Sequence, residues 1–247
     1  MRILVVNPNT TASMTSLIER AAQSVAASAT TIIAKTSRMG PVSIEGYYDE
    51  AFALPGLLLE ISEGEAAGAN AAIIACFDDT GLDAARAMAT IPVIGICEAA
   101  VAMAGLIAQR FSIITTLERS IMPVKGLVHR YGMADRAVIR AADIPVLSLD
   151  DPASDALSKL RAEIEKALRE DCAEAIVLGC AGMADLAHRL QNEYGVPVID
   201  GVSAAVKLAE GLIALGLKTS KRGAYASPLP KPYVGLLAPF APQLSKT

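Results

Sequence analysis

The 247-residue sequence has few of the side chains that most metal and cofactor sites use. It contains two histidines and four cysteines, with no Cys-x-x-Cys pair, so a zinc or iron site is not expected. The glycine-rich signatures of dinucleotide and nucleotide-phosphate sites are missing, as is the Gly-x-Ser-x-Gly of serine hydrolases. We therefore expect a protein that works on a small molecule without a metal or a cofactor.

Charge is also sparse, at 19% of residues and a net −4, so nucleic acid is not an expected partner. The longest weakly charged stretch, 87–109, is interrupted by Pro92 and Glu98, whereas a membrane-spanning helix needs about 20 apolar residues. Only four consecutive apolar residues precede Asn7, too few for the core of a secretory signal. We expect a cytoplasmic protein with reduced thiols and no membrane partner.

Hydrophobic residues make up 53% of the chain but aromatic residues only 4%, and tryptophan is absent, so the core is aliphatic. Short aliphatic runs alternate with segments of helical periodicity, which is typical of an α/β protein with parallel sheets. Thr80 has the spacing of a helix N-cap, and Asp151-Pro152 predicts another helix start. Strands are expected at 2–6, 31–34, 71–75, 93–96, 111–115, 137–141 and 176–179.

The two halves of the chain repeat similar letters in the same order. The first half reads AAIIAC from position 71, IPVIG from position 91 and EAAV from position 98. The second half reads AIVLGC from position 175, VPVID from position 196 and SAAV from position 203. The repeat predicts two pseudo-symmetric α/β halves, residues 1–98 with 210–247 and residues 99–209, with a cleft between them if the halves face one another. The tail from Lys218, rich in proline and glycine, is expected to wrap over the surface.

Cysteines end equivalent strands of the repeat. Ligands of parallel α/β proteins bind beyond the carboxyl ends of the strands, where Cys76 and Cys180 are expected on opposite sides of the cleft. A lone cysteine there is more often a small buried hydrophobe, but two at equivalent points favour a functional pair. A helix start after each favours the thiolate, although two aspartates oppose it at Cys76. The other cysteines, Cys97 and Cys172, are expected to be structural.

Six segments carry a further pattern: VVNPNT at 5–10, GPVSIEG at 40–46, IACFDD at 74–79, FSIITT at 111–116, VLGCAGM at 177–183 and PVIDG at 197–201. Together they resemble the hydantoin racemases, including allantoin racemases, of the aspartate/glutamate/hydantoin racemase family, up to about Lys221. The resemblance implies two α/β halves around one active site and cofactor-independent racemisation by two cysteines, which match Cys76 and Cys180. It also implies a homo-oligomer.

The residues after the cysteines depart from those of the wider family. Glutamate racemases have sequences that resemble Cys-Asn-Thr at the first cysteine and Cys-Thr-His at the second. At the equivalent positions this chain has Cys-Phe-Asp and Cys-Ala-Gly. The polar groups that would hold the charged ends of an amino acid are missing, which favours a neutral ring. Relatives resembling arylmalonate decarboxylase keep only one of the two cysteines, so decarboxylation is disfavoured.

The resulting hypothesis is proton transfer at C5 of a 5-monosubstituted hydantoin, including allantoin. Backbone N–H groups near Pro8–Thr10 and 181–182, with the Thr116 hydroxyl, are candidate donors to the enolate oxygen. Racemisation of an amino acid such as aspartate, and a non-catalytic binding protein of the same fold, stay open as alternatives. The predicted substrate-binding residues are Pro8, Asn9, Ser43, Ile44, Phe77, Thr116, Ala181 and Gly182.

Overall fold

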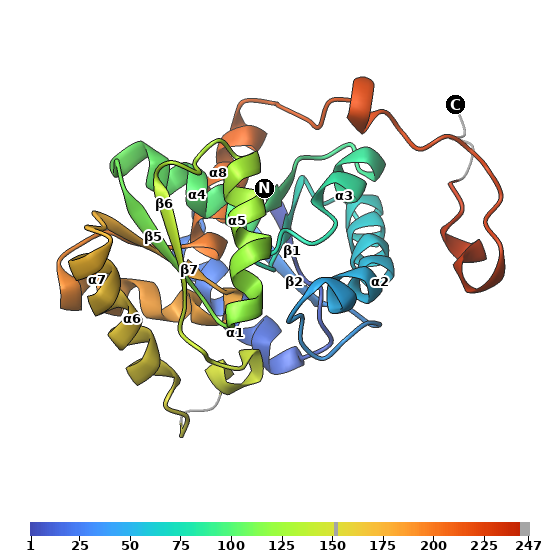
Figure 1. Ribbon diagram of the computed structural model, residues 1–247. Helices are drawn as coiled ribbons and strands as arrows, with labels where there is room; N and C mark the ends of the chain where they lie inside the picture. The colour runs from blue at the N-terminus through green and yellow to red at the C-terminus, as the bar shows by residue number, and fades with distance from the viewer. Residues whose placement is uncertain (151–152, 243–247) are drawn as a thin grey trace.

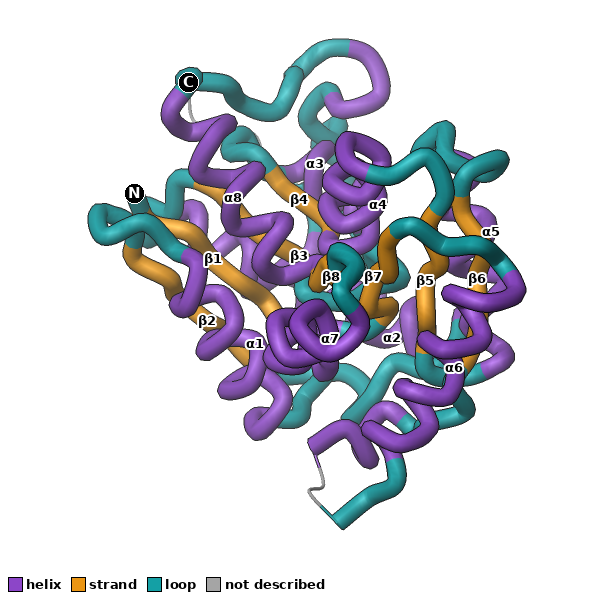
Figure 2. Tube along the Cα trace, turned by 90° about the vertical axis from the view of Figure 1, so that its left-hand side faces the viewer, coloured by secondary structure: helices purple, strands orange, loops and turns teal. Residues whose placement is uncertain are grey.

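Two four-stranded parallel sheets lie next to each other in the computed structural model, which describes residues 1–150 and 153–242 (Figures 1 and 2). The strand orders are β2-β1-β3-β4 and β6-β5-β7-β8, so the second sheet repeats the order of the first and the expected α/β fold is confirmed. The strands are β1 (Arg2–Asn7), β2 (Thr31–Thr36), β3 (Ala71–Ile74), β4 (Val93–Gly95), β5 (Phe111–Thr115), β6 (Ala137–Ala141), β7 (Ala175–Gly179) and β8 (Val198–Asp200).

The inner strands are aliphatic because both faces of each sheet are covered by helices. All residues of β3, β5 and β7 are buried, and so are those of β1 after Arg2. The helices are α1 (Ala12–Val25), α2 (Tyr47–Ala66), α3 (Leu82–Met88), α4 (Ile96–Ile107), α5 (Ile121–Arg130), α6 (Ala156–Glu170), α7 (Ala187–Tyr194) and α8 (Gly201–Ala214). Shorter 3₁₀ helices are η1 (Glu118–Ser120), η2 (Val146–Asp150), η3 (Ala181–Leu186), η4 (Gly223–Tyr225) and η5 (Gly235–Phe240).

Two helices cross between the sheets. Helix α4 follows the first sheet but packs on β7 and β8 of the second, whereas α8 follows the second sheet and packs on β3 and β4 of the first. The helices also pack on each other, and a Cβ at Gly201 would lie 2.4 Å from the Ile96 carbonyl oxygen, so only glycine fits there. One continuous core therefore joins the sheets. The division of the chain at 98/99 and 209/210 stays a prediction.

Two of the predicted helix starts lie near α3 and α6. Thr80 is not a helix N-cap, because Gly81 adopts a left-handed φ of +67° and α3 begins at Leu82. Residues Asp151 and Pro152 lie outside the described residues, and α6 begins at Ala156. No helix in the described part of the chain is both long and apolar enough to cross a membrane.

The expectation that the tail wraps over the surface is wrong beyond Tyr225. Residues up to that point are fastened near α3, where the Thr219 hydroxyl donates to the Ile91 carbonyl oxygen (2.7 Å) and the Tyr225 hydroxyl to Asp83 (2.9 Å). Residues 226–242 then lead away from the body as an extended arm (Figure 1). Residues 226–239 of this arm are all exposed, because they have little of the body to pack against.

Candidate active site

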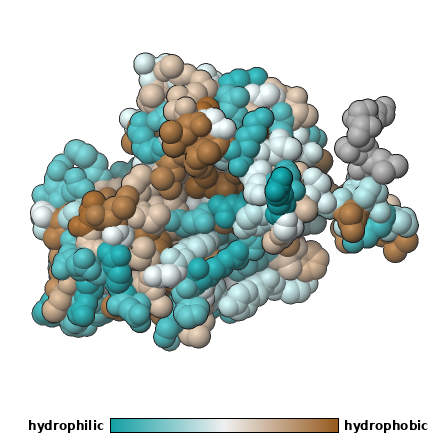
Figure 3. Space-filling view, turned by 90° about the horizontal axis from the view of Figure 1, so that it is seen from above, coloured by the Kyte–Doolittle hydropathy of each residue, from teal (hydrophilic) through white to brown (hydrophobic). Residues whose placement is uncertain are grey.

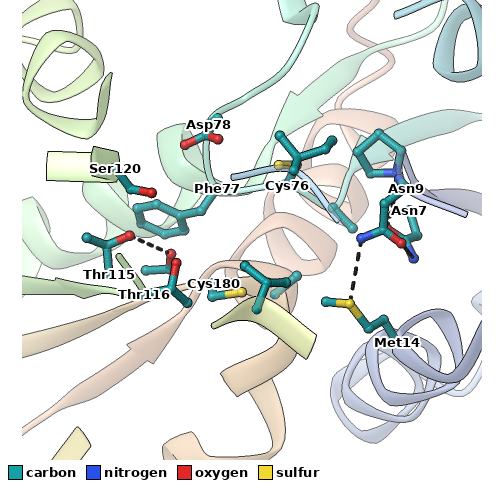
Figure 4. A pocket seen from close by; sticks show the side chains of 16 residues that line it. Asn7, Asn9, Met14, Cys76, Phe77, Asp78, Thr115, Thr116, Ser120 and Cys180 are labelled. Atoms are coloured by element: carbon teal, nitrogen blue, oxygen red, sulfur yellow. Dashed lines mark hydrogen bonds between the residues drawn. The ribbon is translucent and has the colours of Figure 1, made fainter. Parts of the chain in front are cut away.

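One pocket lies where the carboxyl ends of the inner strands of both sheets meet (Figure 4). It encloses about 40 Å³ and includes both cysteines of the predicted pair. Six of the eight predicted substrate-binding residues also line it, whereas Ser43 and Gly182 do not. The lining residues are Asn7, Pro8, Asn9, Met14, Ile44, Ala75, Cys76, Phe77, Asp78, Thr115, Thr116, Ser120, Val146, Gly179, Cys180 and Ala181.

The two thiols come from equivalent places in the two sheets. Cys76 follows β3 and Cys180 follows β7, and each is half-buried. Figure 4 shows them on different walls of the pocket. Cys97 is instead buried in the core on α4, and Cys172 is exposed after α6. Only the first two therefore reach the pocket.

Burial raises the pKa of both pocket thiols. It raises the pKa of Cys76 well above its ordinary value, and the Asp78 carboxylate adds to this effect. It raises the pKa of Cys180 to about 11, although the Gly182 N–H favours the thiolate. The expectation that helix starts favour the thiolate is therefore corrected: the N–H groups act in the expected direction, but loss of hydration outweighs them. Burial therefore favours the thiol form of both cysteines near neutral pH.

A hydrogen-bonded turn after β1 fixes the orientation of the Asn9 side chain. Its Oδ1 accepts from the Thr11 N–H (2.9 Å) and from Asn7 Nδ2 (2.9 Å), so Oδ1 points into the turn and Nδ2 points away from it. The Asn9 Nδ2 contacts the Met14 thioether at 3.6 Å, and a thioether is a weak acceptor. Asn9 is only 5% exposed, so this amide is a buried donor with spare capacity at the pocket wall.

The backbone N–H groups near Pro8–Thr10 are already used. The Asn9 N–H donates to Asn7 Oδ1 (3.2 Å), and the Thr10 N–H donates to the Pro41 carbonyl oxygen (3.0 Å). Proline has no N–H to offer. These groups therefore hold the turn rather than facing a ligand, and the Asn9 side chain takes the place that the sequence suggested for them.

Of the two aspartates after Cys76, Asp79 is structural. Its carboxylate accepts from the N–H groups of Cys97 and Glu98 (both 2.9 Å) and from the Tyr131 hydroxyl (2.6 Å). It thus caps the start of α4. A Cβ at Gly95 would lie 2.2 Å from Asp79 Oδ1, so this cap requires glycine there.

Asp78, in contrast, lines the pocket. Burial, with the nearby charges of Glu50 and Asp79, raises the pKa of Asp78 to about 7. Its carboxylate also raises the pKa of both pocket thiols. While it is ionised, Asp78 thereby disfavours the thiolate form of either cysteine.

Loops from the two halves close the pocket. The Val146 N–H of η2 donates to Glu45 Oε1 (3.1 Å), and the Glu45 N–H donates to Asp49 Oδ2 (2.9 Å). Val146 itself lines the pocket, and so does Ile44, which directly precedes Glu45. Ser43 belongs to the same loop but is not among the lining residues, so its predicted role in binding stays a prediction.

The sequence did not single out several of the lining residues. Met14 fits the apolar face of α1, Ser120 lies in a short 3₁₀ helix, and Val146 follows β6 in a loop without a motif. Asn7, Asp78 and Thr115 also line the pocket, and their positions beside strand ends are a signal that the sequence does provide. Among the described residues, no group of three or more His, Cys, Asp and Glu side chains is arranged to hold a metal ion.

Comparison with known proteins agrees with this fold. Residues 3–209 match the model of the Asp/Glu/Hydantoin racemase family, to which this chain therefore belongs. A hydantoin racemase of Rhizobium meliloti is 52% identical over 95% of this chain and 98% of its own, and one of Pseudomonas sp. (strain NS671) is 49% identical over 97% of each chain. The structure of an allantoin racemase from Klebsiella pneumoniae is 49% identical, with a TM-score of 0.95 over 98% of this chain and 100% of its own.

Proposed function

We propose that this chain racemises 5-monosubstituted hydantoins, including allantoin, by proton transfer between Cys76 and Cys180. The observation that carries the proposal is the pair of thiols, which reach one pocket from equivalent strand ends of the two sheets. Racemisation needs two proton-transfer groups, because a single base would return the proton to the face that it left. Relatives named hydantoin and allantoin racemases, each about 50% identical, support the same activity.

The proposed reaction starts after one of the two thiols has released its proton to solvent, which leaves one cysteine as thiolate and the other as thiol. The thiolate sulfur takes the C5 proton, the C–H electron pair moves into the bond between C5 and C4, and the carbonyl electron pair moves onto the C4 oxygen. The opposite thiol then gives its proton to the other face of C5 as the electrons return. The first cysteine ends as thiol and the second as thiolate, so the enzyme is poised for the reverse reaction.

The Asn9 amide is the proposed donor to the enolate oxygen. Its Nδ2 lies at the pocket wall with only a thioether as partner, and its orientation is held by the turn. A donor that is oriented before the reaction stabilises negative charge as it develops, at no further cost of reorganisation. The hydroxyl of Thr116, a buried residue that lines the pocket from the opposite sheet, is a second candidate donor.

The charges around the pocket favour a neutral ring over an amino acid. Asp78 lines the pocket, and its lining contains no lysine, arginine or histidine among the described residues. The carboxylate of an amino acid would therefore meet a carboxyl group and no cation. Burying a neutral polar group without a partner costs roughly 2–7 kcal/mol, and burying an unpaired charge costs more. A hydantoin carries no carboxylate and avoids this cost.

Comparing substrates tests the proposed function directly. We expect kcat/KM for allantoin or a 5-alkyl hydantoin to exceed that for L-aspartate and L-glutamate by more than tenfold, measured as the loss of optical rotation of a pure enantiomer. Turnover of either amino acid within tenfold of the best hydantoin would instead favour an amino-acid racemase. Binding of a hydantoin without any turnover would favour the non-catalytic alternative.

The raised thiol pKa values predict how alkylation depends on pH. Only the thiolate reacts with iodoacetamide, so we expect the labelling rate of Cys180 to rise about tenfold per unit between pH 7 and pH 10, below its pKa of about 11. In Asp78→Asn, the charge that raises both pKa values is gone, so labelling of Cys76 and Cys180 at pH 8 becomes faster. Mass spectrometry of the two peptides gives the rates, and equal rates in both proteins would contradict this account.

A further inference from the structure

Thr80 carries a buried hydroxyl that takes no part in the hydrogen bonds of the fold. The residue is only 2% exposed, and in the part of the chain that the structure describes its Oγ1 has no hydrogen-bond partner. A buried polar group without a partner loses its hydration and gains nothing in return, so such groups are rare in stable proteins. Thr80 does not cap α3 either, because that helix begins at Leu82. Its hydroxyl therefore needs another explanation.

The turn after β3 holds Thr80 against Cys76. The Asp79 N–H donates to the Cys76 carbonyl oxygen (3.0 Å), which folds the chain back immediately after the strand. Asp79 takes a left-handed φ of +46°, which is uncommon for residues other than glycine, and the hydrogen bonds of its carboxylate to α4 and Tyr131 fix it there. The Thr80 hydroxyl then lies within hydrogen-bonding reach of the Cys76 sulfur, where it lowers the pKa of this thiol.

Thr80 reaches the sulfur from behind the pocket. It is not among the residues that line the active-site pocket, but it lines a separate crevice of about 260 Å³ between α2, α3 and α5. None of the described residues of the C-terminal arm lines this crevice, and the arm projects away from the body (Figure 3). A hydrogen bond from Thr80 would therefore leave the pocket side of the sulfur free for C5 of the substrate.

The second half of the chain has the same turn without the hydroxyl. The Met183 N–H donates to the Cys180 carbonyl oxygen (3.1 Å), as the Asp79 N–H does to that of Cys76. The residue after this turn is Ala184, which is buried and has only a methyl group to offer. The donor is thus present in one half only, and the two thiols of the pair are not equivalent.

We propose that Thr80 is a positioning residue, whose hydroxyl donates to the Cys76 sulfur whenever this sulfur is a thiolate. A thiol sulfur is a weak acceptor, which explains why the hydroxyl has no partner in the thiol form, whereas a charged acceptor forms a stronger hydrogen bond. This hydrogen bond offsets part of the burial, and of the repulsion by Asp78, that disfavour the Cys76 thiolate. The inference rests on the proposed racemisation, in which Cys76 acts as a thiolate on one of the two enantiomers.

Labelling of the thiols tests this hydrogen bond without any turnover. Thr80→Val keeps the shape of the side chain and removes the donor, so we expect iodoacetamide to label Cys76 about tenfold more slowly at pH 8, the usual scale for one hydrogen bond to a charged group. Cys180 in the same sample is the control and should keep its wild-type rate. Thr80→Ser keeps the hydroxyl and should restore the rate at Cys76. The unfolding temperature of Thr80→Val should not fall, because the lost hydroxyl had no partner, and Thr80→Ala gives the same test if valine does not fit.

Racemisation supplies a second measurement. The equilibrium constant between two enantiomers is one, so the loss of the donor must lower kcat/KM by the same factor in both directions. We expect Thr80→Val to lower kcat/KM for each pure enantiomer by up to about tenfold, and Thr80→Ser to keep the wild-type values.

Two results would overturn the proposal. One is an unchanged labelling rate of Cys76 in a folded Thr80→Val, and the other is slower labelling that Thr80→Ser does not restore. Slower labelling of Cys76 in a chain that racemises no hydantoin would support the hydrogen bond and contradict the proposed function instead. Unchanged labelling in an active racemase would reject the role of Thr80 and leave the two-cysteine mechanism in place.

Discussion

We expect serine in place of either Cys76 or Cys180 to abolish racemisation and to leave the fold intact. A hydroxyl is close in shape to a thiol but far less acidic, so the variant keeps the pocket and loses one proton-transfer group. Such a group contributes about 10²–10⁴-fold to the rate of many reactions. The measurement is optical rotation of each pure enantiomer with time, together with a thermal unfolding curve of each variant.

Deuterium exchange sharpens this test. In a single serine variant the remaining cysteine still faces one side of C5, so it can exchange the proton of one enantiomer with solvent and return deuterium to the same face. We expect C76S and C180S to label opposite enantiomers, without racemisation. C172S changes an exposed cysteine outside the pocket and should match wild type. Near wild-type racemisation by either pocket variant would exclude the two-cysteine mechanism.

We expect Asn9→Asp to lower kcat by about 10²–10³-fold, the usual loss when one donor to a developing oxyanion is removed. Aspartate keeps the oxygen that accepts from Thr11 and Asn7, so the turn after β1 is preserved. It replaces the Nδ2 donor by a second carboxylate oxygen, which repels the enolate. The rates come from the same optical assay at saturating substrate, where a loss of turnover is separated from a loss of binding.

Asn7 offers the matched comparison. Its amide lies in the same turn, but its Nδ2 is already bonded within it, to Asn9 Oδ1 and to Thr15 Oγ1 (3.0 Å). We therefore expect Asn7→Asp to lower the unfolding temperature more than Asn9→Asp does. If Asn9→Asp turned over at the wild-type rate with an intact fold, the enolate would have another donor, and Thr116→Val would be the next variant to measure.

The sequence predicts the elements whose signal is local. Aliphatic runs bounded by turns indicate the inner strands, because a strand covered on both faces must be apolar along its length. The repeat places Cys76 and Cys180 at equivalent strand ends, which the strand orders of the two sheets confirm. Their shared pocket follows from this equivalence, since all four inner strands end at it.

What the sequence could not give depends on contacts between distant residues. Val146 reaches the pocket through a hydrogen bond to Glu45, 101 positions earlier, and neither residue lies in a pattern that indicates the other. The raised thiol pKa values depend on how much water the folded pocket excludes, which helix starts near Cys180 do not reveal. The proline and glycine of the tail predict irregular structure, but they do not fix the direction in which it leaves the body.

The exchange of α4 and α8 between the sheets limits how a substrate can enter. Each helix is rooted in one half and packed into the other, so a hinge that separated the halves would have to pull both helices out of a shared core. The pocket, at about 40 Å³, is small for a substituted ring. We expect the ring to enter between the loops around Ile44 and Val146, which one hydrogen bond joins, rather than between the sheets, which share a core. Opening of this kind would leave the positions of Cys76 and Cys180 unchanged, so both enantiomers would meet the same pair of thiols.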